Sequence, residues 1–367
     1  MSAAEATRKH AAATSGDSRA ASRAIAETAA GRARRDEQRP ASPVTAAATQ
    51  FVADHRAAAD ALGDRLANEV GDPAGFVDAL TTGLESIADP LVPDGIRSVT
   101  PGLDAVIGVR LPLLSAVHRR FARGTRRVSS SPILDCTDRL LRHEMAEVRW
   151  FGMWNFERLL ATDPERTWQL MRLAASEASE WISVDTLAHP YGVGILRDGR
   201  RWAEIGQLVY SPSRWERRLV GSTVATLPFV KGVSGARDPG VVERGLGLIA
   251  QLIGDAEPDV QKALSWALRN LAALDRAAVT AFVEREAQAA RTTADGNRAW
   301  VMRDSLAKLV PADAARIRAS IDGIRRRPGA PSTSIAAATS AAFASQPAFA
   351  VPGFAGPSTR AAAAPEE

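Results

Sequence analysis

A tryptophan and an aspartate stand four residues apart in the stretch WISVDTLAHPYG, which begins at Trp181. At that spacing Trp181 and Asp185 share one face of a helix. An indole face attracts positive charge, and a carboxylate stabilises a cation that forms beside it. The pair therefore has the chemistry to hold a cationic reacting group. The alternative is structural, with Trp181 in the core and Asp185 as a capping or first-turn charge.

Two later stretches carry a similar charged and aromatic face. In SPSRWERRLVGSTVATLPF, Trp215 and Arg218 lie three residues apart, behind serines that can cap the helix. In PDVQKALSWALRN, Lys262, Trp266 and Arg269 recur at spacings of three and four. Each tryptophan taken alone is more often a core residue. The recurrence of the pattern on three helices favours a shared functional surface.

The elements that must position these residues are predicted to be helices throughout. Apolar residues recur at three- and four-residue spacing, and Pro-, Gly- and Asp-rich breaks separate short segments. Helices are predicted at 51–69, 74–88, 112–123, 135–145, 148–161, 164–178, 181–194, 199–210, 213–229, 239–253, 258–272, 275–290, 297–309 and 312–325.

Paired short helices predict an all-α protein, an α-solenoid of HEAT-like helical repeats with a concave face where ligands usually bind. The repeat domain is expected over residues 46–327. Residues 1–45 are rich in alanine and arginine and poor in large apolar groups, so a disordered arm is predicted there. Residues 328–367 are rich in alanine, serine and proline, which predicts a disordered tail.

Composition narrows the class of protein. The 367 residues carry a formal net charge of +4, which permits an anionic partner without requiring one. A single cysteine, Cys136, excludes an intramolecular disulfide framework and a cysteine-rich zinc site, and fits a reducing cytosol. No apolar run is long enough for a membrane span, and the N-terminus lacks the apolar segment of a secretory signal.

The three stretches, in this order and at this approximate spacing, resemble the AlkC/AlkD superfamily of DNA alkylation repair proteins, and most closely its AlkD-type branch of HEAT-like DNA glycosylases. The matching motifs are WISVD, WERR and QKALSWALR, and the likeness covers roughly Val99 to Leu309. Carried over residue by residue, the resemblance implies that Trp181, Asp185 and Trp266 line the active site. It also implies that Arg218 contacts a phosphate.

The resemblance implies a reaction as well. Alkylation at N3 or N7 makes a purine cationic and a good leaving group, so the enzyme must mainly stabilise the cationic sugar that forms. Asp185 would supply that stabilisation and orient the attacking water, with the two indoles beside the sugar. AlkD-type enzymes act from the backbone side without flipping the base. The implied function is hydrolysis of N3-alkyladenine and N7-alkylguanine glycosidic bonds in duplex DNA, which initiates base excision repair.

Further residues are expected to contact DNA. The segment IGVRLP places Arg110 where the family carries a neutral polar residue, which favours a contact with the DNA backbone. Basic and aromatic residues on the same helix faces join it, namely Trp215, Arg217, Lys262 and Arg269. HRRFARGTRR, from His118 to Arg127, holds five arginines beside a helix end, and we expect Arg119 and Arg120 to bind phosphate. The alternative for this last segment is a solvated, arginine-biased loop.

Other chemistries are less well matched. The sequence has no phosphate loop of the G-x-x-x-x-G-K-[ST] type and no H-E-x-x-H motif, so no metal or organic cofactor is expected. Two non-enzymatic alternatives remain: a DNA-structure-binding HEAT-like protein of the same superfamily, and a protein-interaction scaffold. We expect a monomer in the bacterial cytosol, associated with the nucleoid through double-stranded DNA that contains alkylated bases.

Overall fold

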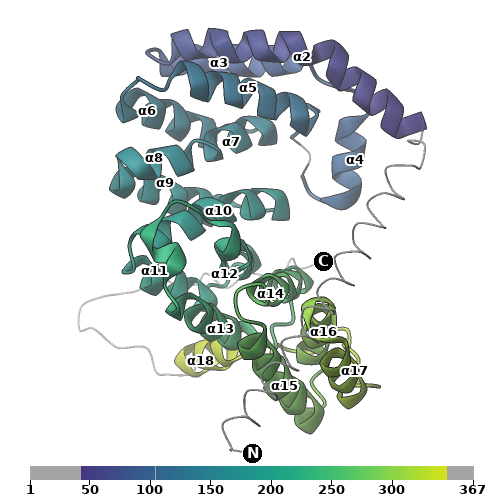
Figure 1. Ribbon diagram of the computed structural model, residues 1–367. Coiled ribbons are helices and arrows are strands. Elements are labelled where there is room, and N and C mark those ends of the chain that lie inside the picture. The colour runs from purple at the N-terminus through teal and green to yellow at the C-terminus, as the bar shows by residue number, and fades with distance from the viewer. Residues whose placement is uncertain (1–42, 104, 345–367) are drawn as a thin grey trace, which may run out of the picture. The chain divides into compact units, whose positions relative to one another are not determined.

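A computed structural model describes residues 43–103 and 105–344, and within these ranges every regular element is an α-helix or a 3-10 helix (Figure 1). The predicted all-α class is confirmed. The chain divides into two compact units, residues 1–58 and 59–367. The described part of the first unit is the beginning of α2 (Pro43–Glu69), where the rings of Phe51 and His55 stack 4.0 Å apart.

The second unit is a succession of short helices. After the end of α2, its first half contains α3 (Pro73–Glu85), α4 (Val92–Val99), α5 (Leu111–Gly124), α6 (Ser130–Leu141), α7 (Ala146–Met153), α8 (Phe156–Thr162) and α9 (Pro164–Glu177). Its second half contains α10 (Trp181–Arg197), α11 (Arg201–Gln207), η1 (Leu208–Tyr210), α12 (Arg214–Thr226), η2 (Leu227–Phe229), η3 (Ser234–Arg237), α13 (Gly240–Leu252), α14 (Pro258–Leu271), α15 (Arg276–Thr293), α16 (Gly296–Ser305), η4 (Leu306–Lys308), α17 (Pro311–Ser320) and α18 (Ile335–Ala344).

Local sequence explains where the three central helices begin. The Glu180 carboxylate accepts hydrogen bonds from the backbone of Ile182 and Ser183 and so caps α10. Ser213 caps α12 through its bond with the amide of Trp215, 3.3 Å long. At the start of α14, Pro258 occupies the first helical position, where a missing N–H costs nothing. The start of each helix in turn determines which residues share a face with its tryptophan.

These three helices pack side by side as successive layers of an α-solenoid of HEAT-like helical repeats (Figure 1). α12 makes the most extensive helix–helix contacts that the structure describes, with α14 on one side and α10 on the other. Gly221 permits the close approach of α12 and α14, because a Cβ at this position would lie 2.9 Å from the Cβ of Ala263. A hydrogen bond from Asn270 to the carbonyl of Ala225, 2.8 Å long, ties the same two helices.

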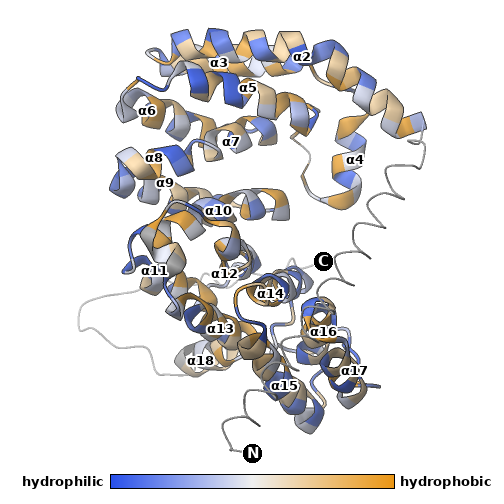
Figure 2. Cartoon of the chain, viewed as in Figure 1, coloured by the Kyte–Doolittle hydropathy of each residue, from blue (hydrophilic) through white to orange (hydrophobic). Residues whose placement is uncertain are grey.

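Most apolar side chains are enclosed between the layers. The helices carry hydrophobic and hydrophilic residues along their lengths, as amphipathic repeat helices do (Figure 2). The lone Cys136 is buried on α6, and burial raises the pKa of its thiol to about 12. None of the helices among the described residues is long and apolar enough to cross a membrane.

The observed helices differ from the predicted ones in a few places. The predicted helix 148–161 is broken at Trp154 and Asn155 into α7 and α8, and the short helix α4 was not predicted. Helix α10, which contains Pro190, extends beyond the predicted end at residue 194 to Arg197. Helix α4 escaped prediction because it is only eight residues long, contains a proline and a glycine, and buries none of its residues.

The predicted tail requires a correction. Residues 328–344 are not disordered: they form an ordered segment that ends in α18, with Ser334 and Ala336 buried. Composition pointed to disorder because alanine and serine offer little apolar surface. The segment is instead held by specific hydrogen bonds to the body of the second unit. Residues 1–42 of the predicted arm and 345–367 of the predicted tail lie outside the described residues.

Replacement of Gly221 by alanine tests the close packing of α12 on α14. The added methyl group must displace Ala263, so we expect the free energy of unfolding to fall by about 1–3 kcal/mol. The control is Gly247→Ala on α13, where a Cβ would meet nothing within 4 Å and alanine's helix propensity should give a small gain. Urea denaturation of both variants measures the difference, and equal stability of the two would contradict the packing argument.

Candidate functional site

Asp185 lies one turn into α10, at its junction with α12. Arg218 of α12 donates to both carboxylate oxygens, from Nε to Oδ1 at 3.1 Å and from Nη2 to Oδ2 at 2.7 Å. Ser222, one turn further along α12, donates from Oγ to Oδ1 at 2.7 Å. Oδ1 therefore accepts two hydrogen bonds and Oδ2 one. The capping alternative for Asp185 is wrong, because Glu180 holds the cap of α10.

Burial distinguishes this ion pair from the surface pairs of the protein. The side chain of Arg218 is 7% exposed and that of Asp185 is 22% exposed. The guanidinium is enclosed between helices, while the carboxylate keeps access to solvent at one edge. A two-pronged pair of this kind fixes the orientation of the carboxylate as well as its charge.

Arg218 also reaches the next helix. Its Nη1 donates to the backbone carbonyl of Asp259, in the first turn of α14, at 2.8 Å. One guanidinium therefore joins α10, α12 and α14 and uses three of its five N–H donors. The sequence placed Arg218 at a phosphate, whereas its bonds in this structure are all to the protein. Two N–H groups form no hydrogen bond among the described residues, and a second carboxylate, that of Asp259, lies 4.0 Å from Nη1.

The two predicted active-site tryptophans are both half-buried rather than part of the core. Trp181 lies one turn before Asp185 on α10, and its indole N–H donates to the carbonyl of Val99 at 3.1 Å. Trp266 lies on α14, and its indole N–H has no hydrogen-bond acceptor among the described residues. The core alternative for Trp181 is therefore not what the structure shows.

The other two predicted residues of α14, Lys262 and Arg269, differ in whether a carboxylate of the protein holds them. Lys262, one turn before Trp266, is exposed. Arg269 is held by α16, because its Nη1 donates to the carboxylate and the carbonyl of Asp304, at 2.5 and 2.9 Å. Ser265 shares that carboxylate through a bond of 2.6 Å. Of the predicted DNA contacts on this helix, Lys262 is the free cation.

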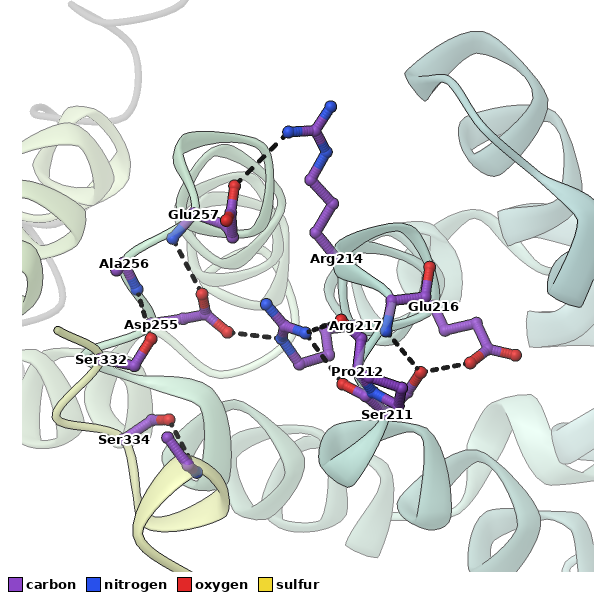
Figure 3. Close-up of polar contacts among 12 residues, drawn as sticks. Ser211, Pro212, Arg214, Glu216, Arg217, Asp255, Ala256, Glu257, Ser332 and Ser334 are labelled. Atoms are coloured by element: carbon purple, nitrogen blue, oxygen red, sulfur yellow. Dashed lines mark hydrogen bonds and ion pairs between the residues drawn. The ribbon is translucent and has the colours of Figure 1, made fainter. Parts of the chain in front are cut away.

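The start of α12 contains two further predicted residues in contrasting settings, Trp215 and Arg217, of which Figure 3 shows Arg217. The guanidinium of Arg214 lies 4.6 Å from the ring centroid of Trp215, and both side chains reach solvent. Arg217 is directed into the protein instead. Its Nε donates to Asp255 at 2.7 Å, and its Nη1 donates to the carbonyls of Ser211 and Pro212.

Arg110 belongs to a loop whose backbone is hydrogen-bonded to a buried carboxylate. The amides of Ile107, Gly108 and Val109 all donate to Glu147, which is 0% exposed, over 2.8–3.2 Å. Arg110 itself is paired with Asp89, from Nε to Oδ2 at 2.6 Å. The segment is therefore rigidly anchored, and the cation at its end is already neutralised by a neighbour.

The arginines of the His118–Arg127 segment are gathered at the C-terminal end of α5. Arg119 is exposed, whereas Arg120 is paired with Asp64. The exposed side chains of Arg123, Arg126 and Arg127 have no ion pair within the described part of the chain. Burial lowers the pKa of His118 to about 4, despite its hydrogen bond to Asn155, so this histidine is neutral at pH 7. The positive charge of the segment comes from arginine alone.

The contacts identify residues that the sequence analysis missed. Ser222 is four residues beyond Arg218 and so shares its helix face, a spacing that could have revealed it. No local pattern marks the other three residues, because each bonds to a residue that is distant in the sequence. They are Asp255, Asp259 and Glu147. Within residues 43–103 and 105–344, no group of three or more histidine, cysteine, aspartate or glutamate side chains is arranged to hold a metal ion.

Comparison with known proteins relates the chain to a family. The model of a family described as DNA alkylation repair enzyme matches residues 80–309. The matched range includes all of the predicted catalytic and DNA-binding residues, and it extends somewhat further towards the N-terminus than the likeness found by motif. Searches of curated proteins and of solved structures gave no match.

A double-mutant cycle measures the strength of the ion pair at the centre of the site. Asp185→Asn, Arg218→Met and the double variant should give a coupling free energy of about 1–3 kcal/mol in urea denaturation, because the guanidinium is buried. The exposed pair of Asp138 and Arg142, one turn apart on α6, is the control and should give less than about 1 kcal/mol. A coupling no larger than that of the control would contradict the structural role of the pair.

Proposed function

The chain belongs to the family of DNA alkylation repair enzymes, and we propose that it is a monofunctional DNA glycosylase. Its proposed substrates are cationic N3-alkyladenine and N7-alkylguanine in duplex DNA. The C1′–N bond breaks, and the base leaves as a neutral molecule with the bonding electrons. Water then adds to C1′ and releases one proton to the solvent. The products are a free base and an abasic site, which begins base excision repair.

The observation that carries this proposal is the carboxylate of Asp185, fixed in direction and still open to solvent. Oδ2 accepts only one hydrogen bond from the protein, so it can accept another from a water molecule. A fixed carboxylate beside C1′ stabilises the positive charge that grows on the sugar as the base departs. Charge that is already oriented needs no rearrangement during the reaction.

The half-buried indoles suit the same intermediate. A ring of Trp181 or Trp266 facing the sugar would contribute on the order of 0.5–2 kcal/mol of cation–π attraction. The bond from Trp181 to the carbonyl of Val99 limits rotation of that indole. The half-buried Trp266 has no such restraint, so we propose that it settles against the DNA when substrate binds.

Arg218 has two proposed roles at once. Its bonds to Asp185 hold the catalytic carboxylate. We propose that its two remaining N–H donors meet the phosphate next to the damaged nucleotide at the small part of the side chain that stays exposed. A guanidinium shared between carboxylate and phosphate would set the distance between the DNA backbone and Asp185. This arrangement fits attack from the backbone side, without flipping of the base.

The remaining DNA contacts are proposed from charge and exposure. Lys262 and the unpaired arginines at the end of α5 are free to neutralise phosphates, whereas Arg110, Arg120 and Arg269 already have carboxylate partners. We propose that the protein acts as a monomer in the bacterial cytosol, at the nucleoid.

Release of alkylated bases from methylated duplex DNA tests the glycosylase directly. The wild-type protein should release N3-methyladenine or N7-methylguanine, and Asp185→Asn should lower the single-turnover rate by about 100-fold or more. Ser222→Ala, which keeps both charges of the pair, should give an intermediate loss.

Unfolding curves of each variant serve as the control for stability. A folded wild-type protein that binds DNA and releases no base would instead favour the non-catalytic, DNA-structure-binding reading. A protein without affinity for duplex DNA would favour the hypothesis of a protein-interaction scaffold.

The salt dependence of duplex binding tests the arginines of α5. Each phosphate contact contributes about 0.9 to the slope of log K against log salt concentration. Replacement of Arg123, Arg126 and Arg127 by alanine should therefore reduce the magnitude of the slope by about 2–3 if all three bind phosphate.

The control changes the same charge elsewhere, at three exposed arginines of α15 and α17, namely Arg276, Arg291 and Arg318. It should leave the slope within about one unit of the wild-type value. Equal slopes for the two triple variants would rule out a DNA contact specific to α5.

A further inference from the structure

The segment that follows α17 returns to the centre of the second unit, although it lies beyond the family-matched residues. The amide of Thr333 donates to the carbonyl of Gly254 at 2.9 Å, and the amide of Ala256 donates to Ser332 Oγ at 2.9 Å. Residues 332–333 therefore hold both sides of Asp255, in the turn that precedes α14. Figure 3 shows Ser332 beside this turn.

Two further features fix the segment in place. The hydroxyl of Thr333 donates to Asp295, and the carbonyl of Pro331 accepts from Asn297 at 3.4 Å. Beyond them α18 packs against α13 and η1, with Ala336 2% exposed. The backbone at Gly254 has a φ of +97°, and an added Cβ there would collide with Thr333. The turn and the segment are therefore closely fitted to each other.

Asp255 connects this turn to the start of α12. It is 2% exposed, and its Oδ2 accepts from Arg217 Nε at 2.7 Å while its Oδ1 accepts from the amide of Glu257 at 2.9 Å. Arg217 in turn donates to two carbonyls just before α12 (Figure 3). One buried ion pair thus ties the first turn of α12 to the turn that precedes α14.

Arg218, the next residue along α12, links the same two helix starts through the carbonyl of Asp259. Two neighbouring arginines therefore connect the beginning of α12 to the beginning of α14. Arg217 does so through Asp255, whose neighbours in sequence are hydrogen-bonded to the C-terminal segment, and Arg218 is also bonded to Asp185. A shift of the α14 start would alter both connections together. It would also move Trp266, which α14 carries.

We propose that the Arg217–Asp255 ion pair, braced by residues 331–344, is a positioning device for the Asp185–Arg218 pair. Arg217 acts through its neighbour and does not contact DNA. The C-terminal segment is accordingly needed for the geometry of the site. This inference rests on the proposed glycosylase function only for its activity readout.

The test displaces the C-terminal segment from the body in the full-length protein. Ala336→Glu places a charge at a buried position of α18, and Ala338→Glu places the same charge at an exposed position two residues away. The first variant should lower the single-turnover rate of N7-methylguanine release at least 10-fold, with duplex affinity within about twofold of wild type. The second should match the wild type.

Asp255→Asn and Arg217→Gln break the positioning pair itself. Both should lower the rate of base release and leave the salt slope of duplex binding unchanged. A contact between Arg217 and phosphate would instead lower the slope by about 0.9 in Arg217→Gln alone. That result, or a full rate of release in Asp255→Asn, would overturn the proposal.

Amide hydrogen exchange separates this inference from the glycosylase function, because it needs no substrate. In Ala336→Glu, exchange should accelerate in residues 214–218 and 257–262, and Ala338→Glu should show no change. Unaltered exchange at both helix starts in Ala336→Glu overturns the positioning role, whatever the activity. Faster exchange in a protein whose wild type releases no base would overturn the glycosylase function alone.

Discussion

The ion pair between Asp185 and Arg218 is the interaction on which the central part of the second unit depends. Its guanidinium is almost fully enclosed, and a buried cation without a counter-charge costs several kcal/mol. The carboxylate is therefore needed for stability as well as for the chemistry we propose. The same side chain links three successive helices, so the position of the carboxylate follows from the packing of the repeats and not from a flexible loop.

Much of the fold could be predicted from periodicity, because amphipathic helices that pack in layers show their buried face directly in the sequence. The predicted helices 164–178, 213–229 and 258–272 each begin within one residue of the observed start. The prediction failed where stability comes from contacts that have no period. Helix α4 is short and buries no side chain. The 328–344 segment is held to a distant turn by hydrogen bonds in which Ser332 accepts and the amide of Thr333 donates.

The site shows the same division. Residue types and spacing were enough to bring Trp181, Asp185, Arg218 and Trp266 to three adjoining helices. Residue types and spacing could not show which arginines already have carboxylate partners within the protein. Arg217 and Arg218 are adjacent and chemically identical, yet one faces Asp255 and the other faces Asp185. Only the direction of each side chain, set by its place on the helix, distinguishes a positioning residue from a candidate for phosphate contact.

The burial of Cys136 has a consequence for a protein that works where alkylating agents are present. The nucleophile that such electrophiles attack is the thiolate, not the thiol. Burial raises the pKa of the Cys136 thiol to about 12, so this side chain is a protonated thiol at pH 7. The only cysteine of the chain is thus a poor target for the alkylating reagents that damage DNA.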